Sequence, residues 1–197
     1  MQPDLFAPSP APGLVPGLRV AAELVDREQE RALVAFVDRC ELEPFKFQGW
    51  LGKRLTTSFG WSYDFERGRI ERGAAMPEEL LPLRTRMAAF AGVDPDDFVQ
   101  ALLIRYDPGA GIGWHRDRPQ FGVVVGLSLG APATLRLRRR RSDGKFERQA
   151  VPLTPRGAYV LDAEVRHEWE HSIAAIDATR WSITFRTLSD LGKRALG

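Results

Sequence analysis

The sequence FVQALLIRYDPGAGIGWHRDRPQFGVVVGLSL, residues 98–129, alternates short apolar runs with turn signals. The run Phe98–Tyr106 ends at Asp107-Pro108-Gly109, and another begins at Gly122. Proline and glycine interrupt strands and fit tight turns, so runs of this length between such residues are typical of short β-strands. The stretch therefore predicts antiparallel β-structure.

The same pattern continues to residue 188. Further turn signals are Gly130-Ala131-Pro132, Asp143-Gly144 and Pro155-Arg156-Gly157. The expected strands are Phe98–Tyr106, Gly113–His115, Gly122–Leu129, Ala133–Arg138, Phe146–Leu153, Ala158–Leu161, Glu168–Ile173 and Trp181–Leu188. About eight short strands with this punctuation favour a jelly roll or related barrel over an alternating βαβ fold.

The first half of the chain is predicted to be richer in helix. Apolar residues at helical spacing predict one helix from Asp26 to about Leu42, with Asp26 as its N-cap and Gln29 three residues later. A second helix is expected to open at Pro77 and to stop before Gly92. These elements and the later strands together predict an α+β fold.

Length and composition predict one domain after a tail. Residues 7–18, APSPAPGLVPGL, contain four prolines and no periodicity, so residues 1–18 are expected to form a flexible Pro-rich tail. Residues 19–197 would then form a single domain, because 197 residues with 44% apolar content suit one core. We expect the jelly-roll core at about residues 98–190.

Charge and cysteine content exclude several classes of protein. The 28 Lys and Arg residues nearly balance the 26 Asp and Glu residues, so overall charge does not identify a nucleic-acid binder. Cys40 is the only cysteine, which excludes an internal disulfide and a zinc site of paired thiolates. With no apolar run long enough to cross a bilayer, we expect a soluble, cytoplasmic monomer.

Three residues have the pattern of a metal site. His115 and Asp117 lie two residues apart, so in a strand or its extended end both point to the same face. His171, from a distant predicted strand, would complete a face of two histidines and one carboxylate. Such a face leaves coordination positions open and suits Fe(II) oxygenases, although zinc hydrolases use similar ligands. The alternative is a polar loop histidine and a core histidine.

The strand at residues 180–186, RWSITFR, has one polar face. Arg180, Ser182, Thr184 and Arg186 share it, because side chains alternate along a strand. A buried, unpaired guanidinium is costly, whereas arginine binds carboxylates through paired hydrogen bonds. The strand therefore predicts an anion site, the alternative being a half-exposed strand with solvated arginines.

Five separated motifs together resemble the AlkB family of Fe(II)/2-oxoglutarate dioxygenases. They are Leu103–Ala110, His115–Asp117, Ser128–Gly130, Arg166–Ile173 and Arg180–Arg186, in the family's order and approximate spacing. The Ser-Leu-Gly triplet and the ending Thr-Phe-Arg are the most specific of these. The resemblance covers about residues 98–188, and it implies a double-stranded β-helix core with a β-rich nucleotide-recognition lid at about residues 45–70.

The resemblance also implies cofactors and site residues. Fe(II) would be bound by His115, Asp117 and His171, with His171 preferred to His167 because of the residues around it. Arg180 would pair with the distal carboxylate of the co-substrate 2-oxoglutarate. The other expected 2-oxoglutarate contacts are Tyr106, Ser128, Ser182 and Arg186. The implied activity uses O2 to dealkylate damaged bases in alkylated DNA, with RNA as a further substrate, releasing an aldehyde, succinate and CO2.

Substrate contacts are expected from the lid and from the loop after Asp117. Trp61 and Tyr63 fall on one face of a predicted strand, and rings of this kind stack on bases, although they are also common in cores. Arg118 follows Asp117, and Pro119 stands where the family often has an acidic residue that reads the base. Ile104 also stands where the family has an asparagine. Because of these two departures, the sequence does not distinguish methyl from etheno adducts as the preferred lesion. The run Arg136–Arg141 suits phosphate contact or a solvated charged surface.

Other interpretations of the sequence are retained. Gln2 to Phe6 resemble the peptide by which bacterial repair proteins dock on the sliding clamp, and the alternative is a disordered start. The same chemistry would also serve an oxygenase that modifies proteins. A non-catalytic cupin-like binding module and a zinc-loaded hydrolase are the readings from other classes.

Overall fold

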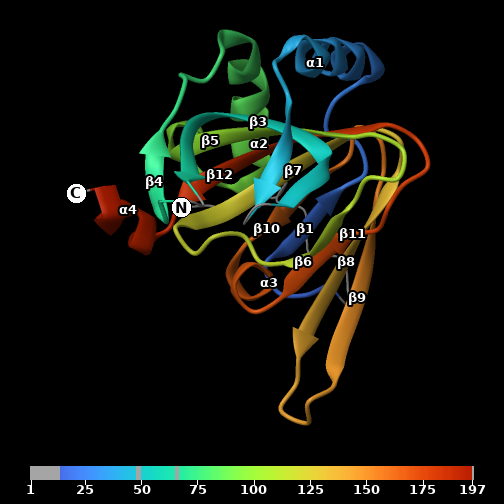
Figure 1. The fold of residues 1–197 in the computed structure, drawn as a ribbon, viewed down its shortest axis with the longest axis vertical. Coiled ribbons are helices and arrows are strands. Elements are labelled where there is room, and N and C mark those ends of the chain that lie inside the picture. Colours follow the sequence, from blue (N-terminus) through green and yellow to red (C-terminus); the bar gives the residue numbers. More distant parts are fainter. Residues whose placement is uncertain (1–13, 48–49, 65–66, 197) are drawn as a thin grey trace, which may run out of the picture.

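The computed structural model describes residues 14–47, 50–64 and 67–196, which form two antiparallel sheets (Figure 1). The larger sheet has the order β1 (Leu18–Ala21), β10 (Ala158–Leu161), β7 (Phe121–Gly130), β12 (Arg180–Leu188), β5 (Phe98–Tyr106), β3 (Trp50–Asp64) and β2 (Glu43–Phe47), with β4 (Arg69–Arg72) paired to β3. The smaller sheet has the order β6 (Ile112–His115), β11 (Glu170–Ile173), β8 (Ala133–Arg140) and β9 (Phe146–Leu153). The predicted α+β jelly-roll fold is confirmed.

Four helices accompany the sheets in the described part of the chain. They are α1 (Arg27–Arg39), α2 (Leu81–Ala91), α3 (Ala163–His167) and α4 (Asp190–Leu196), with 3-10 turns η1 (Glu78–Leu80) and η2 (Pro95–Asp97). Leu33 and Val37 of α1 and Met87 of α2 pack in one cluster with Leu103 and Phe185 of the larger sheet. The first two helices therefore cover the outer face of this sheet and leave its inner face to the second sheet. None of the helices in the described part of the chain is long and apolar enough to cross a membrane.

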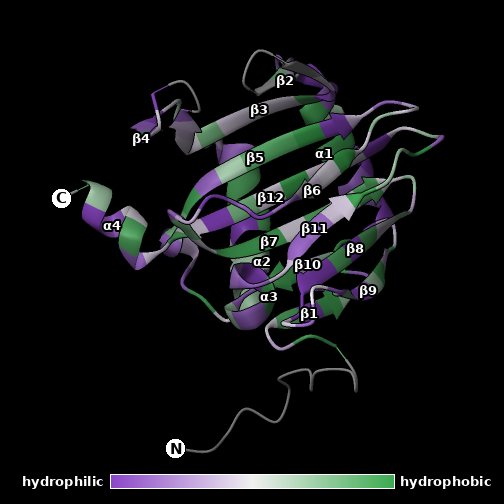
Figure 2. Ribbon diagram, turned by 60° about the horizontal axis from the view of Figure 1, so that its bottom comes forward, coloured by the Kyte–Doolittle hydropathy of each residue, from purple (hydrophilic) through white to green (hydrophobic). Residues whose placement is uncertain are grey.

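The space between the sheets is apolar at one end only. Leu135, Leu137 and Trp169 of the smaller-sheet layer pack with Val124 and Leu161 of the larger sheet. Toward β12, β5 and β3, which lie side by side (Figure 2), polar side chains of β12 and β3 face the space between the sheets together with apolar side chains of β5, among them Leu102 and Ile104. This end forms a cavity, because buried charged and polar groups need partners or water and do not pack into a dry core.

Both predicted helices are present, and capping residues mark their ends. Asp26 caps α1 in a capping box, with its side chain accepting from the backbone of Gln29 and the Gln29 side chain accepting in return. The helix ends at Arg39, before the predicted Leu42. Pro77 caps the 3-10 turn that leads into α2, and Gly92 ends α2 with φ 69°, a conformation that glycine adopts without strain.

Several elements lie outside the prediction. Val15 and Leu18 are buried and β1 pairs with β10, so packed structure begins before the predicted start near residue 19. The expected strand Glu168–Ile173 starts only at residue 170, because α3 and its C-terminal turn occupy the preceding residues. Short elements of this kind are stabilised by tertiary contacts more than by their own sequence.

The predicted lid is an extension of the larger sheet. Residues 55–60 of β3 pair with β5, whereas residues 61–64 pair with β4. Gly60, with φ 80°, lies at this change of partner, and a Cβ there would be 2.0 Å from the carbonyl oxygen of Val99. The close approach requires glycine, so the strand bends out of the sheet at this residue.

Candidate active site

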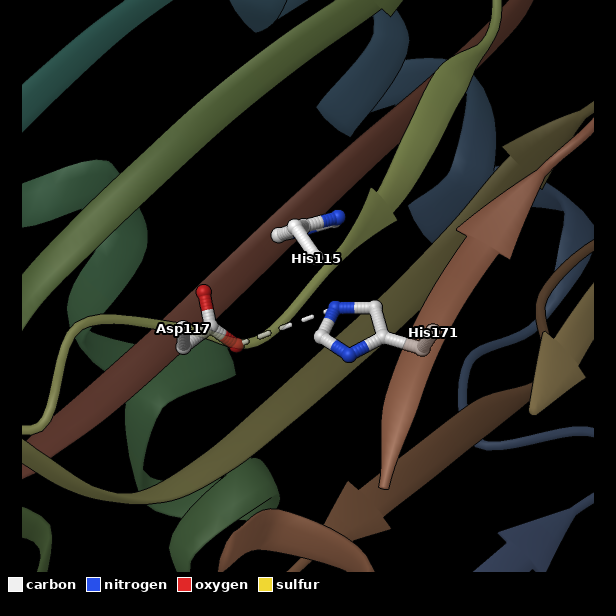
Figure 3. A group of neighbouring side chains, drawn as sticks. All are labelled: His115, Asp117 and His171. Carbon is white, nitrogen blue, oxygen red and sulfur yellow. Dashed lines mark ion pairs between the residues drawn. The ribbon is translucent and has the colours of Figure 1, made fainter. Parts of the chain in front are cut away.

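His115, Asp117 and His171 come together at the inner face of the smaller sheet (Figure 3). His115 ends β6 and stands opposite His171 of β11 in the strand register, while Asp117 follows two residues beyond β6. Nε2 of His171 lies 3.9 Å from Oδ2 of Asp117, and the ligand atoms of all three residues lie within 4.8 Å of one another. This is the cluster that the sequence predicted, with two nitrogens and one oxygen close enough to hold one ion.

The protonation states of the cluster suit a divalent cation. Nδ1 of His115 donates to the carbonyl of Gly113 at 2.8 Å, which assigns the proton to that atom and leaves Nε2 as a lone-pair donor. Burial lowers the pKa of His171 to about 3 and also lowers the pKa of His115. Burial raises the pKa of Asp117, but Arg186 and the two histidines outweigh it and hold that pKa well below its usual range. The ligands are therefore neutral, neutral and anionic at pH 7.

His167, the competing third ligand, lies elsewhere. It is exposed at the end of α3, and its backbone carbonyl accepts a hydrogen bond from Arg116. The described residues thus gather His171, and not His167, with the other two ligands.

Arg186 fixes the orientation of the Asp117 carboxylate. Its Nη2 donates to Oδ1 of Asp117 at 2.9 Å, and its Nη1 donates to Oε1 of the buried Gln100 at 2.7 Å. One carboxylate oxygen is thereby occupied, and the other, Oδ2, faces His171. The Nε atom of Arg186 is buried without a partner, so this residue retains a donor for a ligand of the cavity.

Arg180 is fully buried and incompletely bonded. Its Nε donates to Oγ of Ser128 at 3.0 Å, and its Cζ lies 5.1 Å from the centre of the Tyr106 ring. The Nη1 and Nη2 atoms are buried with no hydrogen-bond partner among the described residues. The alternative of solvated arginines is therefore wrong for Arg180. A carboxylate would satisfy both free donors, since a guanidinium binds a carboxylate through two parallel hydrogen bonds.

Of the remaining residues predicted to contact 2-oxoglutarate, two line the cavity and one supports Arg180. Tyr106 and Ser182 are buried and line the cavity beside Arg180. Ser128, which stands opposite Ser182 in the register, accepts from Nε of Arg180 and so orients the guanidinium from behind.

A cavity of about 1490 Å³ connects these groups to the lid. Ligand pockets are commonly about 300–1,000 Å³, so the space exceeds what one small molecule needs. Tyr63 and Arg118 line it, with Cζ of Arg118 4.6 Å from the centre of the Tyr63 ring. Trp61 is half-buried in register with Arg72 and lies outside the described lining, so its contact with substrate stays a prediction.

Arg166 is a site residue that the sequence reasoning missed. It is 4% exposed and donates to the backbone carbonyls of Arg118, Phe121 and Gly122 at 2.6–2.8 Å, with a longer contact of 3.4 Å to that of Asp117. These bonds tie the loop that carries the ligand carboxylate to α3. Nothing in the spacing around Arg166 indicates this role, because its acceptors are backbone atoms over forty positions away.

Arg54 and Tyr159 were also missed. Both line the cavity, and burial raises the pKa of Tyr159 to about 12. Alternation along β3 places Arg54 on the same face as Thr56 and Ser58. The sequence does not show that this face points into the cavity, because that depends on the pairing of β3 with β5.

The basic run Arg136–Arg141 is partly paired with carboxylates of the protein. Nε of Arg138 lies 2.6 Å from a carboxylate oxygen of Glu170, and Arg139 bonds carboxylates from three other glutamates, namely Glu147, Glu164 and Glu168. Arg136 donates to Ser172. Arg138 therefore links β8 to β11, and Arg139 links β8 to β9 and to the α3 region, so neither offers an unpaired charge to phosphates. The predicted clamp-docking peptide, residues 2–6, lies outside the described residues.

The sequence of this chain is similar to proteins of one family. The sequence profile of the 2OG-Fe(II) oxygenase superfamily matches residues 37–186. The tRNA (carboxymethyluridine(34)-5-O)-methyltransferase ALKBH8 of Macaca fascicularis is 28% identical over 171 residues, which cover 81% of this chain and 24% of that protein. The alkylated DNA repair protein ALKBH8 homolog of Arabidopsis thaliana is 23% identical over 184 residues, covering 81% of this chain and 51% of that protein.

Solved structures support the same fold. The structure of OsALKBH1 matches with a TM-score of 0.65 and 15% identity, covering 88% of this chain and 98% of that one. The chain spans about a quarter of the macaque relative and about half of the Arabidopsis relative. The matched region includes the His-Asp-His cluster and the polar strand β12.

We predict that Arg166→Met lowers the free energy of unfolding by about 2–5 kcal/mol, because several buried carbonyls lose a charged donor together. Urea denaturation of the metal-free protein measures this. Arg148→Met is the matched control, since Arg148 is exposed and donates to one carbonyl at 3.4 Å. Equal free energies of unfolding for the two variants would contradict a stabilising role of Arg166 in the Asp117 loop.

We further predict that metal binding releases few protons. At pH 6, two ordinary imidazoles with pKa about 6.5 would release about 1.5 protons on binding an ion. Because burial keeps His171 and His115 neutral, we expect well under one proton per Co(II) ion. Titration calorimetry at pH 6 in two buffers of different ionisation enthalpy gives the number, and a value near 1.5 would show that the histidines are protonated before the ion binds.

Proposed function

The chain belongs to the 2OG-Fe(II) oxygenase superfamily as an AlkB-like member, and we propose that it removes N-alkyl groups oxidatively from nucleic-acid bases. As a dioxygenase of this family it uses Fe(II), 2-oxoglutarate and O2. The proposed products are the restored base, an aldehyde, succinate and CO2. Alkylated DNA is the proposed substrate, with RNA as the second. The observation that carries the proposal is the His-Asp-His cluster beside a buried arginine with two free donors, in a cavity larger than the co-substrate.

The residues present fit the two groups that the family requires. Two imidazole nitrogens and one carboxylate oxygen form the donor set typical of non-haem Fe(II), and their protonation states need no change. The free Nη1 and Nη2 atoms of Arg180 fit a carboxylate of 2-oxoglutarate. We therefore propose His115, Asp117 and His171 as iron ligands and Arg180 as the anchor of the co-substrate.

The surrounding side chains hold these groups in place. Arg186 keeps one oxygen of Asp117 occupied, so the carboxylate presents a single oxygen to the ion. Ser128 fixes the plane of the Arg180 guanidinium, and Tyr106 packs against it. Tyr106, Ser182 and the Nε atom of Arg186 are the proposed further contacts of 2-oxoglutarate. When bound, iron and 2-oxoglutarate supply the oxidation of the alkyl carbon by O2, and the protein supplies position and exclusion of water.

The substrate side of the proposal rests on the lid. Tyr63 offers a ring and Arg118 a cation at the cavity wall, and base recognition outside a duplex uses stacking and cationic contacts of this type. The names of two relatives refer to tRNA and to alkylated DNA, which supports nucleic acid over protein as the substrate class. A binding module without chemistry would leave the ligand cluster and the free donors of Arg180 unexplained.

The activity is tested with Fe(II)-loaded protein, 2-oxoglutarate, O2 and oligonucleotides that carry N-methylated or etheno bases. We expect succinate to form in step with base restoration, and Asp117→Ala to lower turnover by more than about 100-fold with little change in oligonucleotide binding. Asp143→Ala, in the exposed turn after β8, is the control. Succinate without base restoration would overturn the proposed substrate, and full turnover by the Asp117 variant would remove the metal site.

Arg180 is tested separately through the co-substrate. Replacing it by methionine keeps much of the volume and removes the charged donors, so we expect the KM for 2-oxoglutarate to rise roughly 10- to 100-fold, the range for hydrogen bonds to a charged group. Arg105→Met is the control, because Arg105 lies on the next strand with its side chain bonded to Asp38 and Asp107 outside the cavity. Equal KM values for the two variants would place the carboxylate elsewhere.

A further inference from the structure

We propose that the base oxidised by this protein is uncharged and presents a carbonyl oxygen to Arg54, so that N3-methyluracil-type bases are preferred over cationic N1-methyladenine and N3-methylcytosine. This inference rests on the proposed function and specifies its substrate class. It depends on the placement of Arg54, on its lack of a partner and on the balance of charge in the cavity.

Arg54 lies on the cavity face of the lid strand. Its neighbour Leu55 pairs with Arg105 of β5, so Arg54 falls beside Tyr106, the next residue of that strand. Tyr106 in turn pairs with Arg180 on its other side. Arg54 thus stands in the same cross-strand row as the proposed co-substrate anchor, but on the lid side of Tyr106, where it lines the cavity.

The guanidinium of Arg54 has no acidic partner in the described structure. Its Nε atom is buried without a hydrogen bond, and its Cζ lies 3.9 Å from the centre of the Phe45 ring. Loss of solvation lowers its pKa, and its charge acts on His115 and Arg186. A buried donor that packs on an aromatic ring and faces an open cavity is stabilised when a ligand supplies an acceptor.

The charge balance of the loaded cavity disfavours a cationic base. Fe(II) and the dicarboxylate of 2-oxoglutarate cancel, and Asp117 is already paired with Arg186. Arg54, Arg166 and Arg180 are further positive groups of the wall. The other carboxylates of the described lining, Glu41 and Glu43, are exposed and screened by water. A methylated base with a fixed positive charge would therefore meet like charge, whereas a uracil-type carbonyl is an acceptor for Arg54.

The reaction itself is the same for either type of base. One oxygen atom of O2 enters a C–H bond of the N-methyl group, and the other enters succinate as 2-oxoglutarate loses CO2. The C–N bond of the resulting hydroxymethyl group then breaks and formaldehyde leaves. The hydroxyl proton passes to the ring nitrogen when the base is of the neutral uracil type, and to water when the alkylated base was cationic. The base differs only in charge and in the group beside the methylated nitrogen, and Arg54 acts on both.

N3-methyluracil and N3-methylcytosine in otherwise identical single-stranded oligonucleotides make a matched pair of probes. They have nearly the same shape, but the first is neutral with a carbonyl at C4, and the second is cationic with an amino group there. For the Fe(II)-loaded protein we expect kcat/KM at least about tenfold higher for N3-methyluracil. Arg54→Gln should reduce this ratio at least about tenfold while leaving the KM for 2-oxoglutarate unchanged. A tenfold change is what about 1.4 kcal/mol of differential binding produces.

Lys53→Gln is the control, because it removes the same charge from the neighbouring, exposed position of β3. It should keep the wild-type ratio. Equal rates for the two bases, or a preference for N3-methylcytosine, would overturn the inference while leaving the dealkylase function intact. A raised KM for 2-oxoglutarate in Arg54→Gln without a change in ratio would assign Arg54 to the co-substrate and also overturn it. Restoration of neither base, with other alkylated bases also untouched, would instead remove the proposed function.

Discussion

Strand β12 has one apolar face and one polar face, and the rest of the domain depends on burying the first against the helices and directing the second into the cavity. Ile183 and Phe185 face the helices on the outer side of the larger sheet, while Arg180, Ser182 and Arg186 face the space between the sheets. Pairing with β5 and β7 over nearly the full length of β12 fixes this orientation, since a shift of one residue would exchange the faces. The arginines on the polar face then need anionic partners in the cavity, and the smaller sheet carries the two histidines that complete the site.

Much of this could be predicted from sequence because the signals are local. The bounds of β5, β9 and β10 agree with the prediction, since turn residues mark their ends, and the cap of α1 is readable from Asp26 and Gln29. Alternation and family motifs also led us to expect that His115, Asp117 and His171 come together and that Arg180 faces inward, and both arrangements are present in the structure. The role of Arg166 was not predicted, because its partners are backbone carbonyls that only the folded loop brings near.

Charge runs were the least reliable part of the sequence reading. For Arg138 and Arg139 the sequence left phosphate contact and a solvated charged surface open, and in the fold glutamates from β9, β11 and the α3 region pair with both arginines. Arg54 was not among the residues predicted from the sequence, and in the fold it is a partly buried cation without an acidic partner in the described residues. Sequence shows which charges exist, whereas the fold decides which of them find partners.

The lid and the main sheet share one continuous strand, β3, and this limits how the protein can diversify. Arg54, Thr56 and Ser58 face the cavity only because their part of β3 is locked in register with β5. Inserting or deleting one residue there would turn these side chains toward the helices and bring their neighbours inward. New substrate preferences on this scaffold therefore have to evolve by substitution or by changes of two residues, whereas the lid beyond Gly60, released from that pairing, is free to vary in length.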